Sequence, residues 1–349
     1  MVVGRLLPVL TLAARATALN IGVLGSTGRT GQLVVQRLLE DGHRVKAFTR
    51  DEAKAKAVLP PSVDLLSTAT LDIASAPVEA MRDACTDMDR LIWCASGFTD
   101  GGESIDVLGM RTITAAFKDG GDVDGCPRVV MLSSAGVTRP AWADDKKQRL
   151  LGASDIPIIR LNPGNILDRK AEAEALLRAS DVPYCVVRPT GLKFEGWPQG
   201  RPLFSQGDVA VGRTNALDLA DVLVAVCTEP AACGKTFEMF TLAGYPAPRS
   251  MDGVLRRLAP DMDGPPTEAA VSATYDALQQ LLPGEEQDAT KLEMGRSYEQ
   301  LDSGEVAPRA QGASPTDREV ALASTVAGGD GGGSKRQRIR AALGRLLKI

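Results

Sequence analysis

Three glycines recur at a regular spacing near the start of the chain, in the segment Gly25-Ser26-Thr27-Gly28-Arg29-Thr30-Gly31. The apolar residues 19–24 precede this segment and have the composition of a strand, whereas residues 33–39 have that of a helix. In such a strand–turn–helix unit the first glycine permits a tight turn and the second lets backbone N–H groups approach a diphosphate. The third glycine lets the helix pack closely and point its positive end at that anion. The spacing therefore predicts a dinucleotide site.

The end of the next predicted strand, residues 44–50, bears on which dinucleotide is bound. An acidic residue there would bind the ribose hydroxyls of NAD, but the residue is Arg50, and Arg29 lies within the glycine turn. Two guanidinium groups near the adenosine ribose favour a 2′-phosphate, so we expect NADP(H). The alternative is that Arg50 is simply a solvated residue at a strand end.

Strands and helices alternate in the next part of the chain. Further strands are expected at residues 63–66, 90–94, 128–132 and 184–187, and helices at residues 105–117 and 170–179. Continuous apolar strands that alternate with helices predict an α/β fold with a doubly wound parallel sheet. Small and polar residues follow these strands, where such sheets bind ligands.

The composition excludes several classes of function. The 349 residues are 44% hydrophobic and carry a net charge of −4, so the chain can bury a core and is not a general nucleic-acid binder. No apolar run approaches the length of about 18 residues that a membrane span needs. The single histidine, His43, follows a turn at residues 41–42 and is expected at the surface. With one histidine and no closely spaced cysteines, no metal site is expected.

The two ends of the chain differ from its middle. Residues 1–18 contain two arginines, no acidic residue and a small-x-small ending, which indicates either a leader peptide or a plain N-terminal tail. Residues 19–250 form the predicted Rossmann domain, and residues 251–327 an acidic extension that is mostly helical or disordered, with helices at residues 268–282 and from residue 290. Residues 328–334 have the composition of a flexible linker.

A basic amphipathic helix is predicted at residues 335–349. It has six basic residues, no acidic one and an apolar face with helical spacing. Such a helix suits an anionic membrane surface or an acidic protein partner. The alternative is that it docks on the acidic remainder of its own chain.

Several segments resemble the atypical short-chain dehydrogenases/reductases, in particular the NmrA-like, plastid-type NAD(P)-binding proteins of plants and algae. The resemblance covers residues 19–240 and includes GVLGSTGRTG (22–31), LIWCASG (91–97), VVMLSSAGVT (129–138) and RKAEAEALLRASDVPYCVVRPTGL (169–192). It implies a Rossmann fold that binds NADP(H). Together with the leader-like residues 1–18 it indicates a plastid or other organelle as location, and the alternative is the cytoplasm. It leaves the reaction open, since this family includes reductases, redox sensors and assembly factors.

The resemblance also implies roles for single residues. The diphosphate would lie on residues 25–31 and the 2′-phosphate on Arg50. Further expected cofactor contacts are Asp72 and Ile73 at the adenine, Ala95, Ser96 and Gly97 at the ribose, Ser133 and Ser134 near the nicotinamide, Pro189, Thr190 and Gly191 at its carboxamide, and Lys170 at the nicotinamide ribose.

The sequence departs from this family at the catalytic pair. Its catalytic members use Tyr-x-x-x-Lys, but Ile166 stands four residues before Lys170 and has no proton to donate. Lys170 then remains as the acid, with Ser134 as a hydrogen-bond donor to a carbonyl; alternatively, Lys170 only binds the cofactor. Phe194 and Trp197 follow the sixth strand and either line a substrate cleft or pack the loop.

Two functions are therefore expected. One is an NADPH-dependent reductase of a small carbonyl or enone. The sequence does not name this substrate further. The other is a non-catalytic NADP(H)-sensing assembly or scaffold factor that docks on a membrane or protein complex through residues 335–349.

Overall fold

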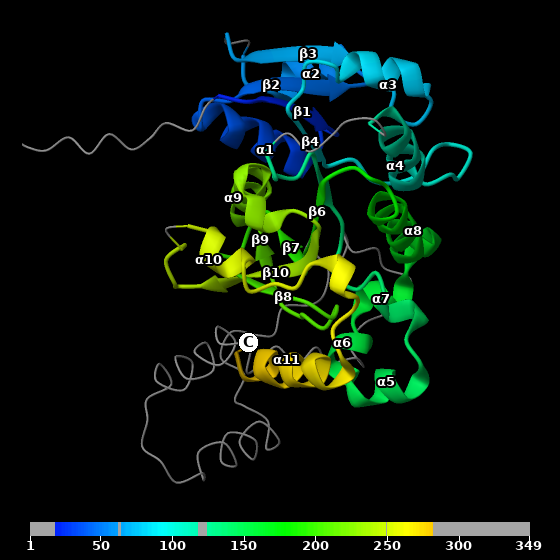
Figure 1. Ribbon diagram of the computed structural model, residues 1–349, viewed down its shortest axis with the longest axis vertical. Helices are drawn as coiled ribbons and strands as arrows, with labels where there is room; N and C mark the ends of the chain where they lie inside the picture. Colours follow the sequence, from blue (N-terminus) through cyan, green and yellow to red (C-terminus); the bar gives the residue numbers. More distant parts are fainter. Residues whose placement is uncertain (1–17, 62–63, 118–123, 249, 282–349) are drawn as a thin grey trace, which may run out of the picture.

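The computed structural model describes residues 18–61, 64–117, 124–248 and 250–281 (Figure 1). The expected leader at residues 1–18, except for its last residue, lies outside the described residues. So do the expected helix from residue 290, the linker at 328–334 and the basic helix at 335–349.

One eight-stranded sheet forms the centre of the fold, and its strand order is β3-β2-β1-β4-β5-β6-β10-β8. The strands are β1 (Asn20–Leu24), β2 (Arg44–Thr49), β3 (Leu66–Thr70), β4 (Arg90–Trp93), β5 (Val129–Leu132), β6 (Tyr184–Pro189), β8 (Gly200–Ser205) and β10 (Lys235–Ala243). All neighbouring strands are parallel except β8, which pairs antiparallel to β10 at one edge. The strand order changes direction at β1 and β4, the position at which open α/β sheets bind ligands.

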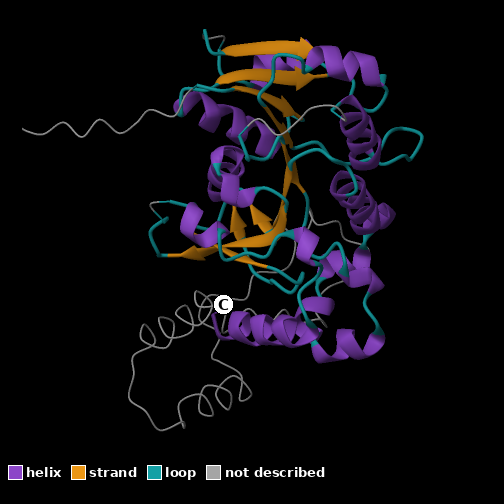
Figure 2. Cartoon of the chain, in the orientation of Figure 1, coloured by secondary structure: helices purple, strands orange, loops and turns teal. Residues whose placement is uncertain are grey.

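Helices cover both faces of this sheet (Figures 1 and 2). On one face lie α1 (Arg29–Glu40) and α9 (Ala216–Ala225), with α2 (Glu52–Val58) and α10 (Asp252–Leu255); on the other lie α3 (Val78–Ala84), α4 (Ile105–Ala116) and α8 (Ile166–Arg178). Each face has its own apolar core of strand and helix side chains. Burial on both faces explains why β1, β4, β5 and β6 are nearly continuous apolar runs. The α/β fold with a doubly wound, mostly parallel sheet is thereby confirmed.

A third apolar cluster lies below the sheet, beside the edge formed by β8 and β10. It includes side chains of α6 (Leu151–Ser154) and α11 (Glu268–Leu281), and α5 (Asp144–Arg149) and α7 (Pro157–Leu161) lie near it. Glu268 ties α11 to α5, because its carboxylate binds Lys146 and Arg149 at 2.7 Å each. The helix expected at residues 268–282 is therefore present and packs on the preceding domain.

Two sequence-based expectations are wrong in detail. The third strand is β3, Leu66–Thr70, rather than residues 63–66: it is an edge strand with exposed Ser67, Thr68 and Thr70, so no apolar run marks its position. His43 is buried, not at the surface, because it packs under the start of β1 and its Nδ1 accepts a hydrogen bond from the Leu19 N–H at 3.2 Å. Burial lowers the pKa of His43.

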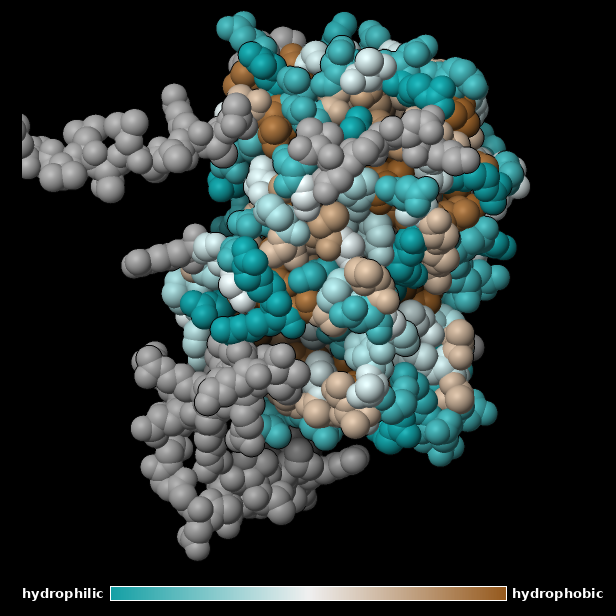
Figure 3. Space-filling model, viewed as in Figure 1, coloured by the Kyte–Doolittle hydropathy of each residue, from teal (hydrophilic) through white to brown (hydrophobic). Residues whose placement is uncertain are grey.

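A two-stranded parallel sheet of β7 (Leu192–Lys193) and β9 (Thr214–Asn215) stands apart from the main sheet. It links the segment after β6 to the start of α9. Within the described ranges, no helix has the length and apolar character needed to cross a bilayer. Hydrophilic residues cover much of the face seen in Figure 3, and apolar residues show between them in separate spots.

Candidate functional site

The glycine turn between β1 and α1 has no room for side chains at two of its positions. Gly25 has a φ of +80°, and a Cβ there would lie 2.5 Å from the backbone nitrogen of Ala95. A Cβ on Gly31 would lie 2.2 Å from the carbonyl oxygen of Gly25. Gly28 is exposed and stands at the N-cap of α1 without a side-chain cap, so the first N–H groups of this helix remain open to an anion. This arrangement fits the diphosphate of a dinucleotide.

The other residues of the turn mainly hold its shape. The Ser26 hydroxyl is buried and donates to the carbonyl oxygen of Phe48 in β2 at 2.7 Å. The carbonyl oxygen of Thr27 accepts from Gln32, and Thr30 is buried. Of the seven residues, Gly28 and Arg29 are the exposed ones.

The carboxyl ends of β2 and β3 lie side by side, since Leu71 N–H donates to the Thr49 carbonyl at 2.8 Å. Arg50 follows β2, is exposed, and makes no hydrogen bond or ion pair with any described residue. Asp72 follows β3 and accepts from Ala74 N–H and Ser75 Oγ, which fixes its turn, and Ile73 is buried beside it. This strand edge thus offers one unpaired cation, with the buried Ile73 nearby.

A buried ion pair joins the two helices of the opposite face. Lys170 Nζ in α8 lies 2.9 Å from Oδ1 of Asp106 in α4. Asp106 is fully buried and also accepts from Trp93 Nε1 at 3.3 Å and from Ser96 Oγ at 3.0 Å. The ammonium of Lys170 is therefore fixed beside the end of β4, where Ala95, Ser96 and Gly97 follow the strand.

Cys94 lies at the same strand end. Burial raises the pKa of its thiol to about 12, although the charge of Lys170 acts in the opposite direction. Cys94 is thus a protonated thiol at neutral pH and not a thiolate nucleophile.

The two serines after β5 differ in their surroundings. The Ser133 hydroxyl is buried and donates to Glu174 at 2.6 Å. Glu174 is fully buried one turn beyond Lys170 and also binds Arg188 and Arg178. Burial alone would raise the pKa of Glu174, but the charge and hydrogen bonds of Arg188 outweigh it and lower the pKa. Ser134 is partly exposed, and its hydroxyl donates to the carbonyl of Ala135 at 3.0 Å.

The end of β6 is closed by the small sheet. Pro189 and Thr190 are buried, and Thr190 Oγ1 lies 3.2 Å from Thr214 Oγ1 of β9. Gly191 directly precedes β7 and is partly exposed. Its carbonyl accepts a hydrogen bond from Thr214 N–H at 3.1 Å.

The segment after β7 reaches back toward the glycine turn. β6 and β1 are separated by β4 and β5, a gap of roughly 14 Å at the usual strand spacing. Phe194 bridges to α1, because the Arg29 guanidinium lies over its ring. The Trp197 indole N–H donates to the Thr241 carbonyl of β10 at 3.4 Å, and the Trp197 carbonyl accepts from Asn215 Nδ2 of β9 at 2.6 Å.

Several buried charged residues of this region carry no signal in the sequence. Asp208, which has a φ of +59° and is 1% exposed, accepts from the N–H groups of Gly136 (2.6 Å) and Thr138 (2.8 Å) and so holds the loop after β5. Asp106 and Glu174 lie within helices, and the residue spacing in the sequence reveals only the apolar faces of these helices. The contacts of Asp106 with Lys170 and of Glu174 with Ser133 join residues 64 and 41 positions apart, so sequence spacing alone could not pair them.

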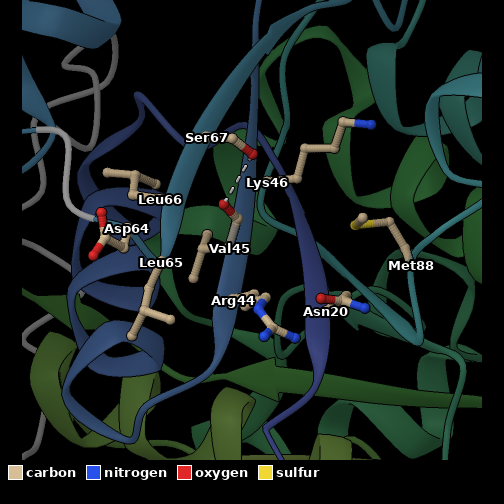
Figure 4. Close-up of a pocket in the computed structure, with 9 residues that line it drawn as sticks. All are labelled: Asn20, Arg44, Val45, Lys46, Asp64, Leu65, Leu66, Ser67 and Met88. Carbon is tan, nitrogen blue, oxygen red and sulfur yellow. Dashed lines mark hydrogen bonds between the residues drawn. The ribbon is translucent and has the colours of Figure 1, made fainter.

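A shallow hollow lies at the opposite end of the sheet, at the amino ends of β1 and β2 (Figure 4). Its lining includes Arg44, Lys46 and Asp64, and the Lys46 ammonium is bound to the Ala84 carbonyl at 2.8 Å. It lies away from the carboxyl ends of the strands, so it does not belong to the candidate site. Among the described residues, no group of three or more potential metal ligands occurs.

Comparison with known proteins gives a consistent result. The sequence profile of the NAD(P)H-binding family matches residues 25–230. An uncharacterized chloroplastic protein of Arabidopsis thaliana is 28% identical over 235 residues, which are 65% of this chain and 78% of that protein. The chloroplastic protein TIC 62 of Oryza sativa is 28% identical over 178 residues, and the match spans 49% of this chain but only 35% of TIC 62.

Solved structures share the fold. The oxidoreductase YlbE of Lactococcus lactis superimposes with a TM-score of 0.52 at 18% identity, covering 71% of this chain and 99% of YlbE. A putative NAD-dependent epimerase/dehydratase of Bacillus halodurans gives a TM-score of 0.51 at 20% identity, covering 69% of this chain and all of that protein. The expected resemblance to NAD(P)-binding Rossmann-fold proteins, with plastid relatives, is thereby confirmed.

Proposed function

Because the chain belongs to the NAD(P)H-binding family, we propose that it is an NADPH-dependent reductase of a small carbonyl or enone, with Lys170 in place of the usual tyrosine–lysine pair. One observation carries this proposal: the Lys170 ammonium is held by the fully buried Asp106 at 2.9 Å, beside the strand ends that face the cofactor crevice. Such a pair keeps a proton donor in one place.

The chain's own residues account for binding of the cofactor. The uncapped start of α1 and the turn at residues 25–31 would hold the diphosphate. The exposed and unpaired Arg50 would take the 2′-phosphate, which favours NADP(H) over NAD(H).

The proposed reaction needs one proton besides the hydride. In carbonyl reduction, a bound NADPH would supply the hydride for the carbonyl carbon, and the carbonyl oxygen would gain the proton. A lysine ammonium has three N–H donors, and Asp106 engages Lys170 through a single 2.9 Å contact, so donors remain for a substrate oxygen or for the ribose of the cofactor. Ser134 is partly exposed and would donate the second hydrogen bond after its single O–H turned away from the Ala135 carbonyl, to which it donates in this structure at 3.0 Å.

The test is NADPH oxidation by the full chain with a panel of aldehydes, ketones and enones, compared between the wild type and Lys170→Gln. Glutamine still donates to Asp106 but has no proton to release. An acid role predicts a kcat lower by about 10²-fold or more with little change in the dissociation constant of NADPH. A raised dissociation constant with unchanged kcat would show that Lys170 only binds the cofactor, and would contradict the acid role.

A second candidate is a non-catalytic NADP(H)-sensing factor, and Ile166 favours it because the position of the usual tyrosine has no donor. Tight binding of NADPH without turnover of any panel compound would support this candidate.

Relatives named as chloroplastic proteins lead us to propose a plastid location. Docking through residues 335–349 would be tested by membrane co-sedimentation with and without that segment.

A further inference from the structure

The side chain of Arg213 lies flat against Gly191, just beyond the end of β6. A Cβ at position 191 would lie 2.7 Å from Nη1 and 3.4 Å from Cδ of Arg213, and 2.9 Å from the carbonyl oxygen of Gly212. Any larger residue at position 191 would therefore push this guanidinium away. The glycine leaves room for the arginine side chain at this strand end.

The backbone around Arg213 is fixed on both sides. Arg213 directly precedes β9, its carbonyl accepts from Thr241 N–H at 2.8 Å, and Thr214 N–H binds the Gly191 carbonyl at 3.1 Å. The strand order puts β6 three strands from β1, on the side away from β2 and Arg50. In an open α/β sheet this carboxyl edge faces the ligand crevice.

Arg213 is a half-buried residue, and its guanidinium is unpaired. Within the part of the chain that the structure describes, no carboxylate or other acceptor engages it. The other buried arginines nearby differ: Arg188 binds Glu174, and Arg139 donates to the carbonyl oxygens of Asp208, Ala153 and Ala210. An unpaired guanidinium can form charge-assisted hydrogen bonds with an anion, and these are stronger than hydrogen bonds to a neutral acceptor.

We propose that Arg213 binds a carboxylate of the substrate, so that the substrate class is a carbonyl compound that also carries a carboxylate. This inference rests on the proposed function, which places the reacting carbonyl at the same crevice. The cofactor's own anions have other partners there, namely the start of α1 and Arg50. The planar fork of the guanidinium matches a carboxylate through two parallel hydrogen bonds, which a neutral amide of the same shape cannot provide.

The test uses two ketones of equal size, 4-acetylbenzoate and 4-acetylbenzamide. Their binding to the NADP⁺-loaded full chain is measured by calorimetry, where no reduction can occur, and their reduction is then followed with NADPH. We expect the wild type to bind the acid at least about tenfold more tightly than the amide. Arg213→Met should abolish this difference and leave NADP⁺ affinity unchanged, and Arg213→Lys should keep part of it. Arg257→Met, at an exposed arginine of another surface, is the control.

Equal affinities in the wild type, no binding of the acid, or a preference that survives in Arg213→Met would overturn the inference. Loss of NADP⁺ binding in a folded Arg213→Met protein would also overturn it, since Arg213 would then belong to the cofactor site. A wild type that binds NADP⁺ normally but binds the acid and the amide equally contradicts this inference alone. A wild type that fails to bind NADP⁺ contradicts the proposed function as well.

Discussion

The guanidinium carbon of Arg29 lies 4.3 Å from the centroid of the Phe194 ring. This contact joins the first turn of α1 to the segment that follows β7, across the strand ends between them. Sequence spacing predicts that Arg29 assists Arg50 at a 2′-phosphate. Because Phe194 follows β7 and Arg50 follows β2, we expect Arg29 to act at the diphosphate, which NADPH and NADH share.

We therefore expect Phe194→Ala to weaken the binding of both nucleotides about two- to fivefold, as loss of a partly exposed cation–π contact implies. Phe194→Leu keeps an apolar side chain without the aromatic ring and serves as the matched comparison. Calorimetric titration measures both. Weaker binding of NADPH alone would contradict this role and would support a contact of Arg29 with the 2′-phosphate.

The ion pair of Asp106 and Lys170 should also matter for stability. Asp106→Asn leaves the Lys170 ammonium buried without its counter-charge, and such a loss costs about 3 kcal/mol. Urea unfolding of Asp106→Asn, Lys170→Gln and the double variant gives the coupling between them. The double variant should lose clearly less than the sum of the two single losses. Additive losses would show that the two side chains do not stabilise each other.

Glu238 of β10 should make stability depend on pH. Burial, and then the charge of Asp208, raise its pKa from the ordinary 4.5 to about 7 in the folded chain. The folded protein thus keeps a proton that the unfolded chain releases between these values. The contribution of Glu238 to the free energy of unfolding is therefore present below about pH 4.5 and is lost as the pH rises to about 7.

Replacement by a neutral isostere tests this dependence. Glu238→Gln should raise the free energy of unfolding at pH 8 by up to about 3 kcal/mol and change it little at pH 4.5. Glu79→Gln, at an exposed position of α3, is the control and should have no such effect. Denaturation curves at the two pH values measure the difference. A destabilised Glu238→Gln protein at pH 8 would rule out the proposed direction.

The third glycine of the turn should tolerate no side chain. In Gly31→Ala the new Cβ would lie 2.2 Å from the carbonyl oxygen of Gly25, so α1 must move away from β1. We expect loss of nucleotide binding and a lower melting temperature. Gly253→Ala in α10, where a Cβ would meet nothing within 4 Å, should change neither. Unchanged nucleotide binding in Gly31→Ala would mean that close packing of α1 is not required.

Local features of this fold were predictable from the sequence, and long-range ones were not. The glycine turn follows from steric limits within seven residues, and β1, β4, β5 and β6 follow from burial on both faces. β3 was misplaced because an exposed edge strand has no apolar pattern, and His43 because its burial depends on how the chain before β1 crosses it. The pairing of Lys170 with Asp106, and the position of Arg213 against Gly191, depend on contacts between distant segments.

The proposed site binds NADPH, and its preference for the 2′-phosphate depends on Arg50. The most direct measurement is calorimetric titration of the full chain with NADPH and with NADH, for the wild type, Arg50→Ala and Arg44→Ala. Arg44 is exposed at the opposite end of the same strand and serves as the control. We expect the wild type and Arg44→Ala to bind NADPH at least about tenfold more tightly than NADH, and Arg50→Ala to bind both equally. Equal binding of both nucleotides by the wild type, or binding of neither, would contradict it.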